Sequence, residues 1–147
     1  MIRKRISARD DKTIVAIIEQ TLLPFTRKHA PETRIDLKSL RKRLEGGITY
    51  VAQATGMQPV GFMTLRHIKT TLYIDMLAIQ TRFQKRGYGT LFMQKAERTA
   101  RLLGCSDLAL WVDDTNDRAQ RFYMGKGFEA TYFDPNIQCY LMSKRIV

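Results

Sequence analysis

The 147-residue sequence lacks the features that mark secreted, disulfide-linked or membrane-spanning proteins. Its two cysteines are too few for a disulfide framework, and its basic start is not followed by the apolar core of a signal peptide. No apolar run approaches the roughly 18 residues that a membrane-spanning helix needs. These absences predict a cytoplasmic protein without a membrane partner.

The sequence is also poor in residues that could bind a metal ion or form an acyl-enzyme. His29, His67, Cys105 and Cys139 are scattered and show no ligand pair at metal-site spacing. No G-x-S-x-G elbow is present, and neither cysteine has an activating motif. We therefore expect no metal ion and no covalent acyl-enzyme.

Positive charge, by contrast, is abundant. Twenty-five Lys and Arg residues against 14 Asp and Glu give a formal net charge of +11. Such a surplus attracts polyanions, whether nucleic acid, an anionic membrane or a phosphate-rich cofactor. The hydrophobic fraction of 44% and the charged fraction of 27% are those of a globular protein, and the length suits one domain over residues 1–147.

Turn residues and apolar periodicity divide the chain into strands and helices. An apolar stripe at residues 14, 17, 18 and 22 predicts a helix that Asp10 and Asp11 open and that Pro24 ends or kinks. The order β-α-α-β-β-β-α-β-α-β-β predicts an α+β (α/β) domain around one mixed sheet. Strands are expected at 2–7, 49–54, 60–68, 71–79, 108–112, 128–133 and 138–142, and further helices from residue 36 to the glycines at 46–47, over 90–103 and over 117–124.

The loop between strand 71–79 and helix 90–103 combines two glycines with three cations, at residues 82, 85 and 86. Unpaired N–H groups at a helix start attract anions, and Gly87 and Gly89 let the backbone approach a phosphate closely. These residues predict an anion site suited to a diphosphate, although a loop of solvated cations would have a similar sequence.

Other phosphate and nucleic-acid motifs fit this loop poorly. Phe92 stands where the dinucleotide fingerprint G-x-G-x-x-G has its third glycine, and no G-K-[ST] follows for a Walker loop. Residues 86–89 match the first half of an RNA-recognition octamer, but Thr90 and Met93 replace the two aromatic residues on which bases would stack. Nucleic-acid binding is therefore disfavoured.

Two motifs together resemble the GNAT superfamily of N-acetyltransferases. Gln84, Gly87 and Gly89 fill its Q/R-x-x-G-x-G/A loop, which follows a strand ending L-x-I/V, while Thr81 replaces the usual proline. Residues 116–128 match its N-x-x-A-x-x-F-Y-x-x-x-G-F pattern at every fixed position. The order of the elements is also similar over nearly the whole chain.

This resemblance implies a GNAT-like fold that uses acetyl-coenzyme A (acetyl-CoA) as cosubstrate. Strands 71–79 and 108–112 would splay apart, with the pantetheine arm in the gap and the diphosphate on the loop. Main-chain groups of Leu77 and Ile79 would hold the pantetheine and the thioester carbonyl, and Asn116 would contact the arm near its sulfur. The cofactor-binding residues that the resemblance implies are Leu77, Ala78, Ile79, Arg82, Gln84, Lys85, Arg86, Gly87, Tyr88, Gly89, Thr90, Asn116, Ala119 and Phe122.

The resemblance also assigns Tyr123 as the general acid that protonates the departing thiolate, with a packed core aromatic as the alternative. Asp75 is the one carboxylate within the central strand. By alternation it shares a strand face with Leu77 and Ile79 unless a bulge breaks the parity, so it is the candidate base. His67 ranks below it, and a water relay with no single base is also open.

The sequence thus predicts an N-acetyltransferase that moves an acetyl group from acetyl-CoA directly to a primary amine through a tetrahedral intermediate. The alternative is a non-catalytic domain that senses acyl-CoA or binds nucleic acid. The acceptor stays open between a small molecule and a protein, and the aspartates at 113, 114 and 117 could attract a cation. Residues 3–5 and the second helix leave room for an acidic protein partner or nucleic acid, and the last hairpin permits a homodimer.

Overall fold

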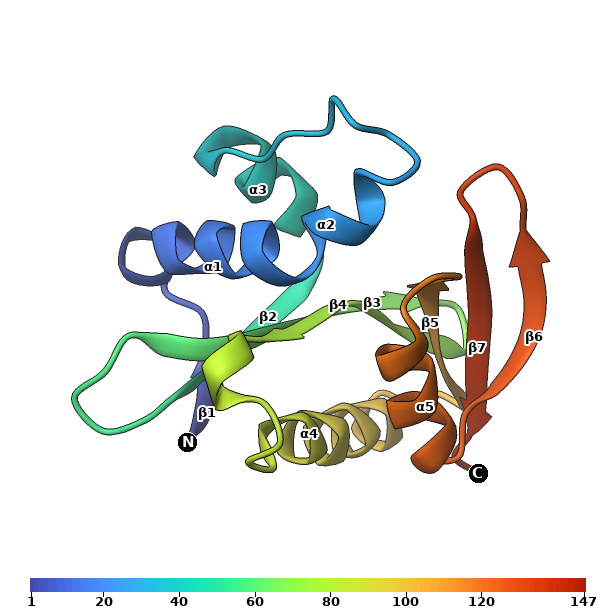
Figure 1. Cartoon of the computed structure of the whole chain (residues 1–147). Helices are drawn as coiled ribbons and strands as arrows, with labels where there is room; N and C mark the ends of the chain where they lie inside the picture. Colours follow the sequence, from blue (N-terminus) through green and yellow to red (C-terminus); the bar gives the residue numbers. More distant parts are fainter.

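A seven-stranded mixed sheet runs through the computed structural model, which describes all of residues 1–147 (Figure 1). The strand order is β1-β2-β3-β4-β5-β7-β6. This arrangement confirms the predicted α+β class and mixed sheet. The elements are β1 (Ile2–Lys4), α1 (Ser7–Thr21), α2 (Leu23–Thr26), α3 (Leu37–Leu44), β2 (Ile48–Gln53), β3 (Pro59–Ile68), β4 (Thr71–Ile79), a 3-10 turn (Thr81–Phe83), α4 (Tyr88–Leu102), β5 (Asp107–Asp113), α5 (Asp117–Gly125), β6 (Glu129–Asp134) and β7 (Cys139–Arg145).

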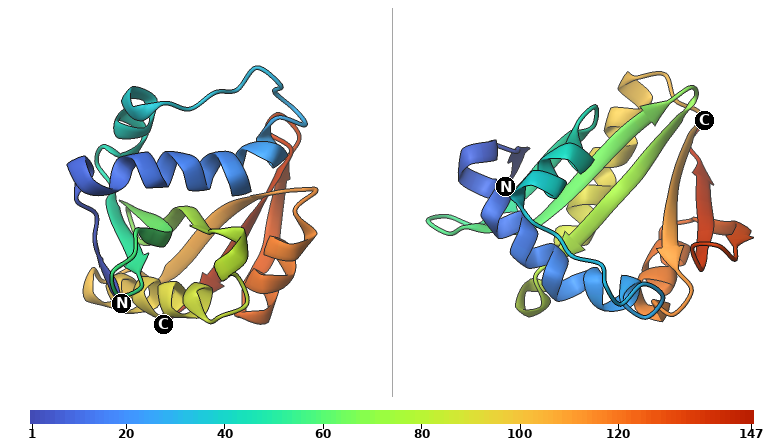
Figure 2. Two further views of the ribbon diagram at one scale, coloured as in Figure 1. Left: turned by 60° about the vertical axis from the view of Figure 1, so that its left-hand side comes forward. Right: turned by 90° about the horizontal axis from the view of Figure 1, so that it is seen from above.

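The parallel pair at the centre of the sheet separates part-way along its length. β4 and β5 are paired only from Thr71 with Asp107 to Tyr73 with Ala109, although both strands continue well beyond these residues. Seen from above, the two strands form a V whose open end lies at their C-terminal ends, where α2 and α5 also lie (Figure 2). The splay expected from the resemblance is therefore present.

Helices cover both faces of the sheet and create two hydrophobic cores. Helices α1 and α3 cover one face, where Ile14 and Leu40 pack with Phe62 of β3. Helix α4 covers the other face, where Phe92 belongs to the same cluster as Met63, the next residue along β3. Successive strand residues point to opposite faces, so one strand supplies both cores. Burial of each such side chain contributes about 1.5–3 kcal/mol.

The start of α1 differs from the prediction. The helix begins at Ser7, and Asp10 and Asp11 lie inside it, fully buried. Arg3 of β1 forms a bidentate pair with Asp10, at 2.8 and 2.9 Å. Arg5 pairs in the same way with Asp11, at 2.6 and 2.8 Å. The two carboxylates therefore neutralise Arg3 and Arg5, and these two arginines are not free for an acidic partner.

Pro24 does not simply end a helix. Helix α1 ends at Thr21, and Pro24 lies in the first turn of the short helix α2, where the missing N–H of proline has no intrahelical partner to lose. The sequence did not predict α2 as a separate element. None of the helices has the length and apolarity that a membrane crossing requires.

Candidate active site

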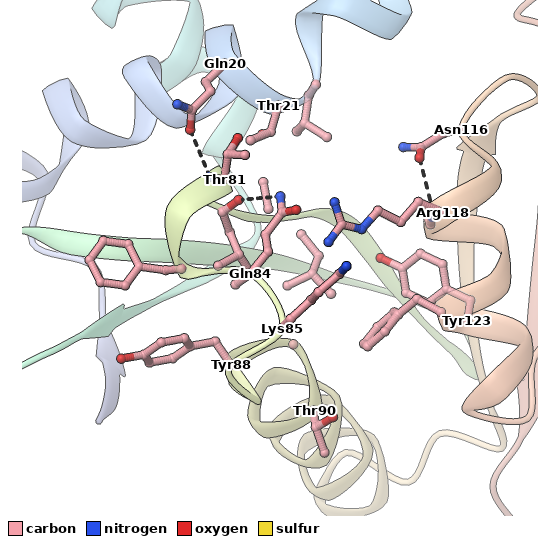
Figure 3. A pocket seen from close by; sticks show the side chains of 18 of the residues that line it. Gln20, Thr21, Thr81, Gln84, Lys85, Tyr88, Thr90, Asn116, Arg118 and Tyr123 are labelled. Carbon is pink, nitrogen blue, oxygen red and sulfur yellow. Dashed lines mark hydrogen bonds between the residues drawn. The ribbon is translucent and has the colours of Figure 1, made fainter.

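A cavity of about 490 Å³ opens between α1–α2, the end of β4, the loop that follows it, and α5 (Figure 3). It lies at the open end of the V formed by β4 and β5 (Figure 2). The general acid candidate Tyr123 lines it. So do twelve of the predicted cofactor contacts, namely Leu77, Ala78, Ile79, Gln84, Lys85, Gly87, Tyr88, Gly89, Thr90, Asn116, Ala119 and Phe122.

Six consecutive backbone N–H groups at the start of α4 have no acceptor within the protein. The N–H of Gln84 donates to Thr81, and the next N–H that donates is that of Leu91, so residues 85–90 donate to no protein group. Lys85 and Gly87 have positive φ angles of 63° and 89°, which turn the chain sharply into the helix. Together with the helix dipole, these N–H groups form a site for an anion.

The glycine at 89 brings α4 and α5 into close contact. A Cβ atom at this position would lie only 3.0 Å from Cζ of Phe122. The second glycine of the loop therefore allows α4 to pack closely on Phe122, and a larger residue there would force the ring of Phe122 to shift.

Two glutamine side chains hold the loop in place. Nε2 of Gln84 donates to the carbonyl of Ile79 at 3.0 Å, and the N–H of Thr81 donates to Oε1 of Gln20 at 3.1 Å (Figure 3). Gln84 thus ties the loop back to the last residue of β4, while Gln20 ties it to α1. Gln84 therefore orients the backbone N–H groups that follow it.

Tyr123 is buried, and its hydroxyl points into the cavity (Figure 3). Its ring packs edge-on against Phe122 and Phe128, with centroids 5.3 and 5.6 Å apart. Burial raises the pKa of the phenol well above its ordinary value. The hydroxyl is therefore protonated throughout the neutral pH range and can donate a proton.

Comparison with known proteins agrees with this geometry. A family model described as the Acetyltransferase (GNAT) family matches residues 10–128. The chain belongs to this family. No curated protein sequence matches the chain.

Solved structures show the same fold as this member of the GNAT family at low sequence identity. Ard1 from Thermoplasma volcanium aligns with a TM-score of 0.79 and 21% identity over 100% of this chain and 97% of its own. The ribosomal-protein-S18-alanine N-acetyltransferase from Escherichia coli aligns at 0.78 and 15%, over 99% and 93%. The PaiA N-acetyltransferase from Thermoplasma acidophilum, solved in complex with coenzyme A, aligns at 0.76 and 18%, over 99% of both chains.

Two predicted cofactor contacts lie outside the cavity. The guanidinium groups of Arg82 and Arg86 lie over the ring of Phe83, at 4.8 and 5.4 Å from its centroid. Neither residue lines the cavity, whereas Lys85 between them does. The structure thus separates the three loop cations into one that faces the cavity and two that stack on an aromatic ring.

Asp75, the predicted base, does not line the cavity. A β-bulge opposite Thr64 and Leu65 of β3 makes Asp75 an extra residue and breaks the alternation of β4. Ile74 and Leu77 both face the α4 core, although they are three residues apart. Asp75 instead forms ion pairs with Arg43 of α3 at 3.2 Å and Arg66 of β3 at 3.8 Å. The expected shared face with Leu77 and Ile79 was wrong.

His67 also lies apart from the cavity. It is exposed, and its Nε2 contacts the carbonyl of Lys69 at 2.8 Å within its own hairpin. No carboxylate or imidazole lines the cavity, so this geometry favours the water relay among the three proton routes considered. Asn116 does line it, and its Oδ1 also caps α5 by accepting from the N–H of Ala119 at 3.2 Å.

Arg118 is the charged cavity residue that sequence reasoning missed. It lies in the first turn of α5, at a variable position of the motif, and its guanidinium points into the cavity toward Lys85 (Figure 3). It forms no ion pair. A cation in the first turn opposes the helix dipole, and this conflict is the signal that could have identified it. The other missed lining residues are Gln20, Thr21, Leu22, Phe25, Thr81 and Phe83.

Proposed function

We propose that this acetyltransferase moves the acetyl group of acetyl-CoA directly to a primary amine of a small molecule or protein. The observation that carries this proposal is the row of six unpaired N–H groups at residues 85–90, beside the open end of the β4–β5 splay. This row suits a diphosphate, and the gap next to it suits an extended thioester arm. Lys85 and Arg118 add positive charge from two sides of the same cavity.

In this proposal the thioester carbonyl, which is the electrophile, lies against the sheet. Beyond Tyr73, the edge of β4 that faces β5 has no strand partner. Main-chain groups of Leu77 and Ile79 on this segment would hold the arm and direct an N–H at the thioester oxygen. A preorganised N–H at this place stabilises the negative charge that develops when an amine attacks.

Proton transfer completes the proposed reaction. The neutral amine forms a C–N bond to the thioester carbon, and the tetrahedral intermediate loses the C–S bond. Tyr123 donates its proton to the departing thiolate, and the proton of the attacking nitrogen leaves through water. An alkyl ammonium must first lose a proton to become nucleophilic, so turnover should rise with pH until the amine is neutral.

Release of coenzyme A tests this function. We expect the protein to release free thiol from acetyl-CoA only when a suitable amine is present, and mass spectrometry should find the acetyl group on nitrogen. A screen of amines and of peptides with free N-termini would identify the acceptor class. Tight acetyl-CoA binding without transfer to any amine would favour the sensing alternative.

Removal of the cavity cations should weaken acetyl-CoA binding. We expect Lys85→Ala and Arg118→Ala each to raise the KM for acetyl-CoA about tenfold, because each loses a charge-assisted contact to phosphate. The effect should shrink as salt is added, since salt screens partly exposed charges. Arg86→Ala is the matched control, because Arg86 stacks on Phe83 outside the cavity. An equal effect of all three variants would contradict the assignment.

The left-handed conformation of Gly87 should matter for binding beyond its effect on stability. Ala at φ 89° is strained by about 1–2 kcal/mol, and Gly56 at φ 72° provides the same strain in a distant turn. No atom lies within 4 Å of the added Cβ at either position. We expect similar losses of stability from Gly87→Ala and Gly56→Ala, but weaker acetyl-CoA binding only from Gly87→Ala, measured by calorimetry. Equal affinities in the two variants would count against the anion site.

A further inference from the structure

One imidazole and two carboxylates meet where the segment after α2 contacts the end of β5. Nε2 of His29 lies 3.2 Å from Oδ2 of Asp113 and 3.6 Å from Oδ1 of Asp114. All three atoms lie within 4.8 Å of one another. The views in Figure 2 show the end of α2 beside the turn between β5 and α5, so the fold brings together side chains that are far apart in the sequence.

The two aspartates have no lysine or arginine as a partner, although the chain contains 25 such residues. The buried carboxylates of Asp10 and Asp11, by contrast, are each paired with an arginine. The one basic group within ion-pair distance of Asp113 and Asp114 is the imidazole of His29. The two side chains are only 12% and 26% exposed, so little solvent screens their negative charges. A divalent cation would supply the positive charge that this group of side chains lacks.

Oδ1 of Asp114 points to a ligand most directly. It is buried and has no hydrogen-bond partner, and it is the only side-chain nitrogen or oxygen atom of the chain in this position. A buried carboxylate oxygen without a donor is costly, whereas coordination of a metal ion satisfies it. Lys28 is close but does not satisfy it, because its Nζ donates to Oγ1 of Thr115 at 3.1 Å.

The positions of the three atoms suit a zinc ion. Zn²⁺ binds histidine nitrogen and carboxylate oxygen at about 2.0–2.2 Å, which places neighbouring ligands of a tetrahedron about 3.3 Å apart. The separations measured from Nε2 of His29, 3.2 and 3.6 Å, are close to this value. Three protein ligands leave a fourth position for water, and the exposed imidazole leaves a path for an ion from solvent.

Hydrogen bonds hold both aspartates in place. The N–H and hydroxyl of Thr115 donate to Oδ1 of Asp113, at 2.9 and 2.7 Å, so Oδ2 is the oxygen that faces His29. Nε2 of Gln120 donates to the main-chain carbonyls of Asp113 and Asp114, at 2.9 and 3.1 Å. Partners of this kind orient the ligands around a metal ion, and they are present here before any ion binds.

We propose that His29, Asp113 and Asp114 form a zinc site. The sequence analysis did not predict it, because these residues have no metal-site spacing and only the fold brings the histidine to the two aspartates. Bound zinc links the segment after α2 to the end of β5, in addition to the hydrogen bond between Lys28 and Thr115, and so stabilises the folded chain. None of the three ligands lines the cavity, so the site does not rest on the proposed function.

Isothermal titration calorimetry with ZnCl₂ tests this site. On protein treated with a chelator and then dialysed, we expect saturable binding of one zinc ion per chain. Zinc at roughly a hundred times its Kd should raise Tm by about 5–10 °C. His29→Gln and Asp113→Asn should each weaken zinc binding at least about tenfold. MgCl₂ should not raise Tm, because an imidazole ligand favours zinc, whereas a merely acidic surface would attract both ions.

Two variants are matched controls for the zinc titration. His67→Gln removes the other histidine, whose Nε2 contacts the carbonyl of Lys69 in its own hairpin. Cys139→Ser removes a thiol on the neighbouring strand, which donates to the carbonyl of Ile137 at 3.3 Å. Both variants should bind zinc as the wild type does. No zinc binding, equal affinity of His29→Gln and the wild type, or loss of binding in Cys139→Ser would overturn the proposal.

Acetyl-CoA binding separates the zinc site from the proposed function. His29→Gln should bind acetyl-CoA as tightly as the wild type, because the imidazole does not line the cavity. A chain that binds zinc through His29 but acetylates no amine would keep the zinc site and refute the proposed function. A chain that acetylates an amine but binds no zinc would refute the zinc site and keep the proposed function.

Discussion

Tyr123→Phe should lower kcat about a hundredfold or more, with acetyl-CoA affinity changed by less than about twofold. The variant removes one hydroxyl and keeps the ring that packs against Phe122 and Phe128. The departing thiolate then has no buried proton donor. Because the pKa of Tyr123 is raised by burial, the wild-type rate should show no loss on the alkaline side from ionisation of this phenol below about pH 10.

Tyr88→Phe is the matched control for this variant. Tyr88 also lines the cavity, but its hydroxyl points away from it (Figure 3). We expect near wild-type kcat and KM from Tyr88→Phe in a steady-state assay of thiol release. Equal turnover of Tyr123→Phe and wild type would remove Tyr123 from the reaction.

Asp11→Ala should have the largest effect on folding stability. Asp11 is buried and accepts hydrogen bonds from Arg5, Ser7 and Arg41, at 2.6 to 2.9 Å. Its removal leaves two arginines without their counter-charge, which costs about 3 kcal/mol, at the lower end of the range for buried pairs because the arginines keep some solvent. Urea unfolding should show this loss of free energy. Thermal unfolding should show a fall in Tm of about 6–12 °C.

The same carboxylate should make the free energy of unfolding fall at acid pH. Burial alone would raise the pKa of Asp11, but hydrogen bonds from Arg5, Ser7 and Arg41 outweigh it and lower the pKa to about 2. A carboxyl group with a depressed pKa stabilises the fold fully above its unfolded-state value near 4, and this contribution is lost as the pH falls toward 2. The lost contribution is about 2 kcal/mol.

Asp75→Asn serves as the control for the stability prediction. Its ion pairs with Arg43 and Arg66 are partly exposed, so we expect a loss below about 1 kcal/mol. The pH below which the fold loses this stability should be unchanged in Asp75→Asn and should shift in Asp11→Asn. If Asp11→Ala and Asp75→Asn lowered the free energy of unfolding equally at pH 7, the buried network around Asp11 would contribute no more to stability than the partly exposed ion pairs of Asp75.

Much of the fold could be predicted because its signals are local. The strand at 71–79 matches β4 residue for residue, and the glycines at 87 and 89 lie where backbone N–H groups without a protein acceptor precede and begin α4. The start of α1 was less predictable, because Asp10 and Asp11 are buried in ion pairs with Arg3, Arg5 and Arg41 from other segments of the chain. Two acidic residues directly before an apolar stripe are typical of a helix start, so the sequence pattern alone predicts that the helix begins there.

The parts of the site that escaped prediction depend on contacts between distant segments. Asp75 was placed by strand alternation, and a bulge opposite β3 overturned that placement. His29 and Asp113 are far apart in sequence, so nothing local indicated that the segment after α2 contacts the end of β5. Arg118 occupies a variable position inside a recognised motif, and only the cavity shows where its guanidinium points.

A calorimetric titration with acetyl-CoA and with acetyl-pantetheine, which lacks the diphosphate, tests the proposed cofactor site most directly. We predict one-to-one binding of acetyl-CoA and binding of acetyl-pantetheine at least about a hundredfold weaker, because the N–H groups of residues 85–90 and the two cavity cations then have no anion to bind. Equal affinities for the two compounds, or no binding of either, would contradict the assignment of this cavity to acetyl-CoA.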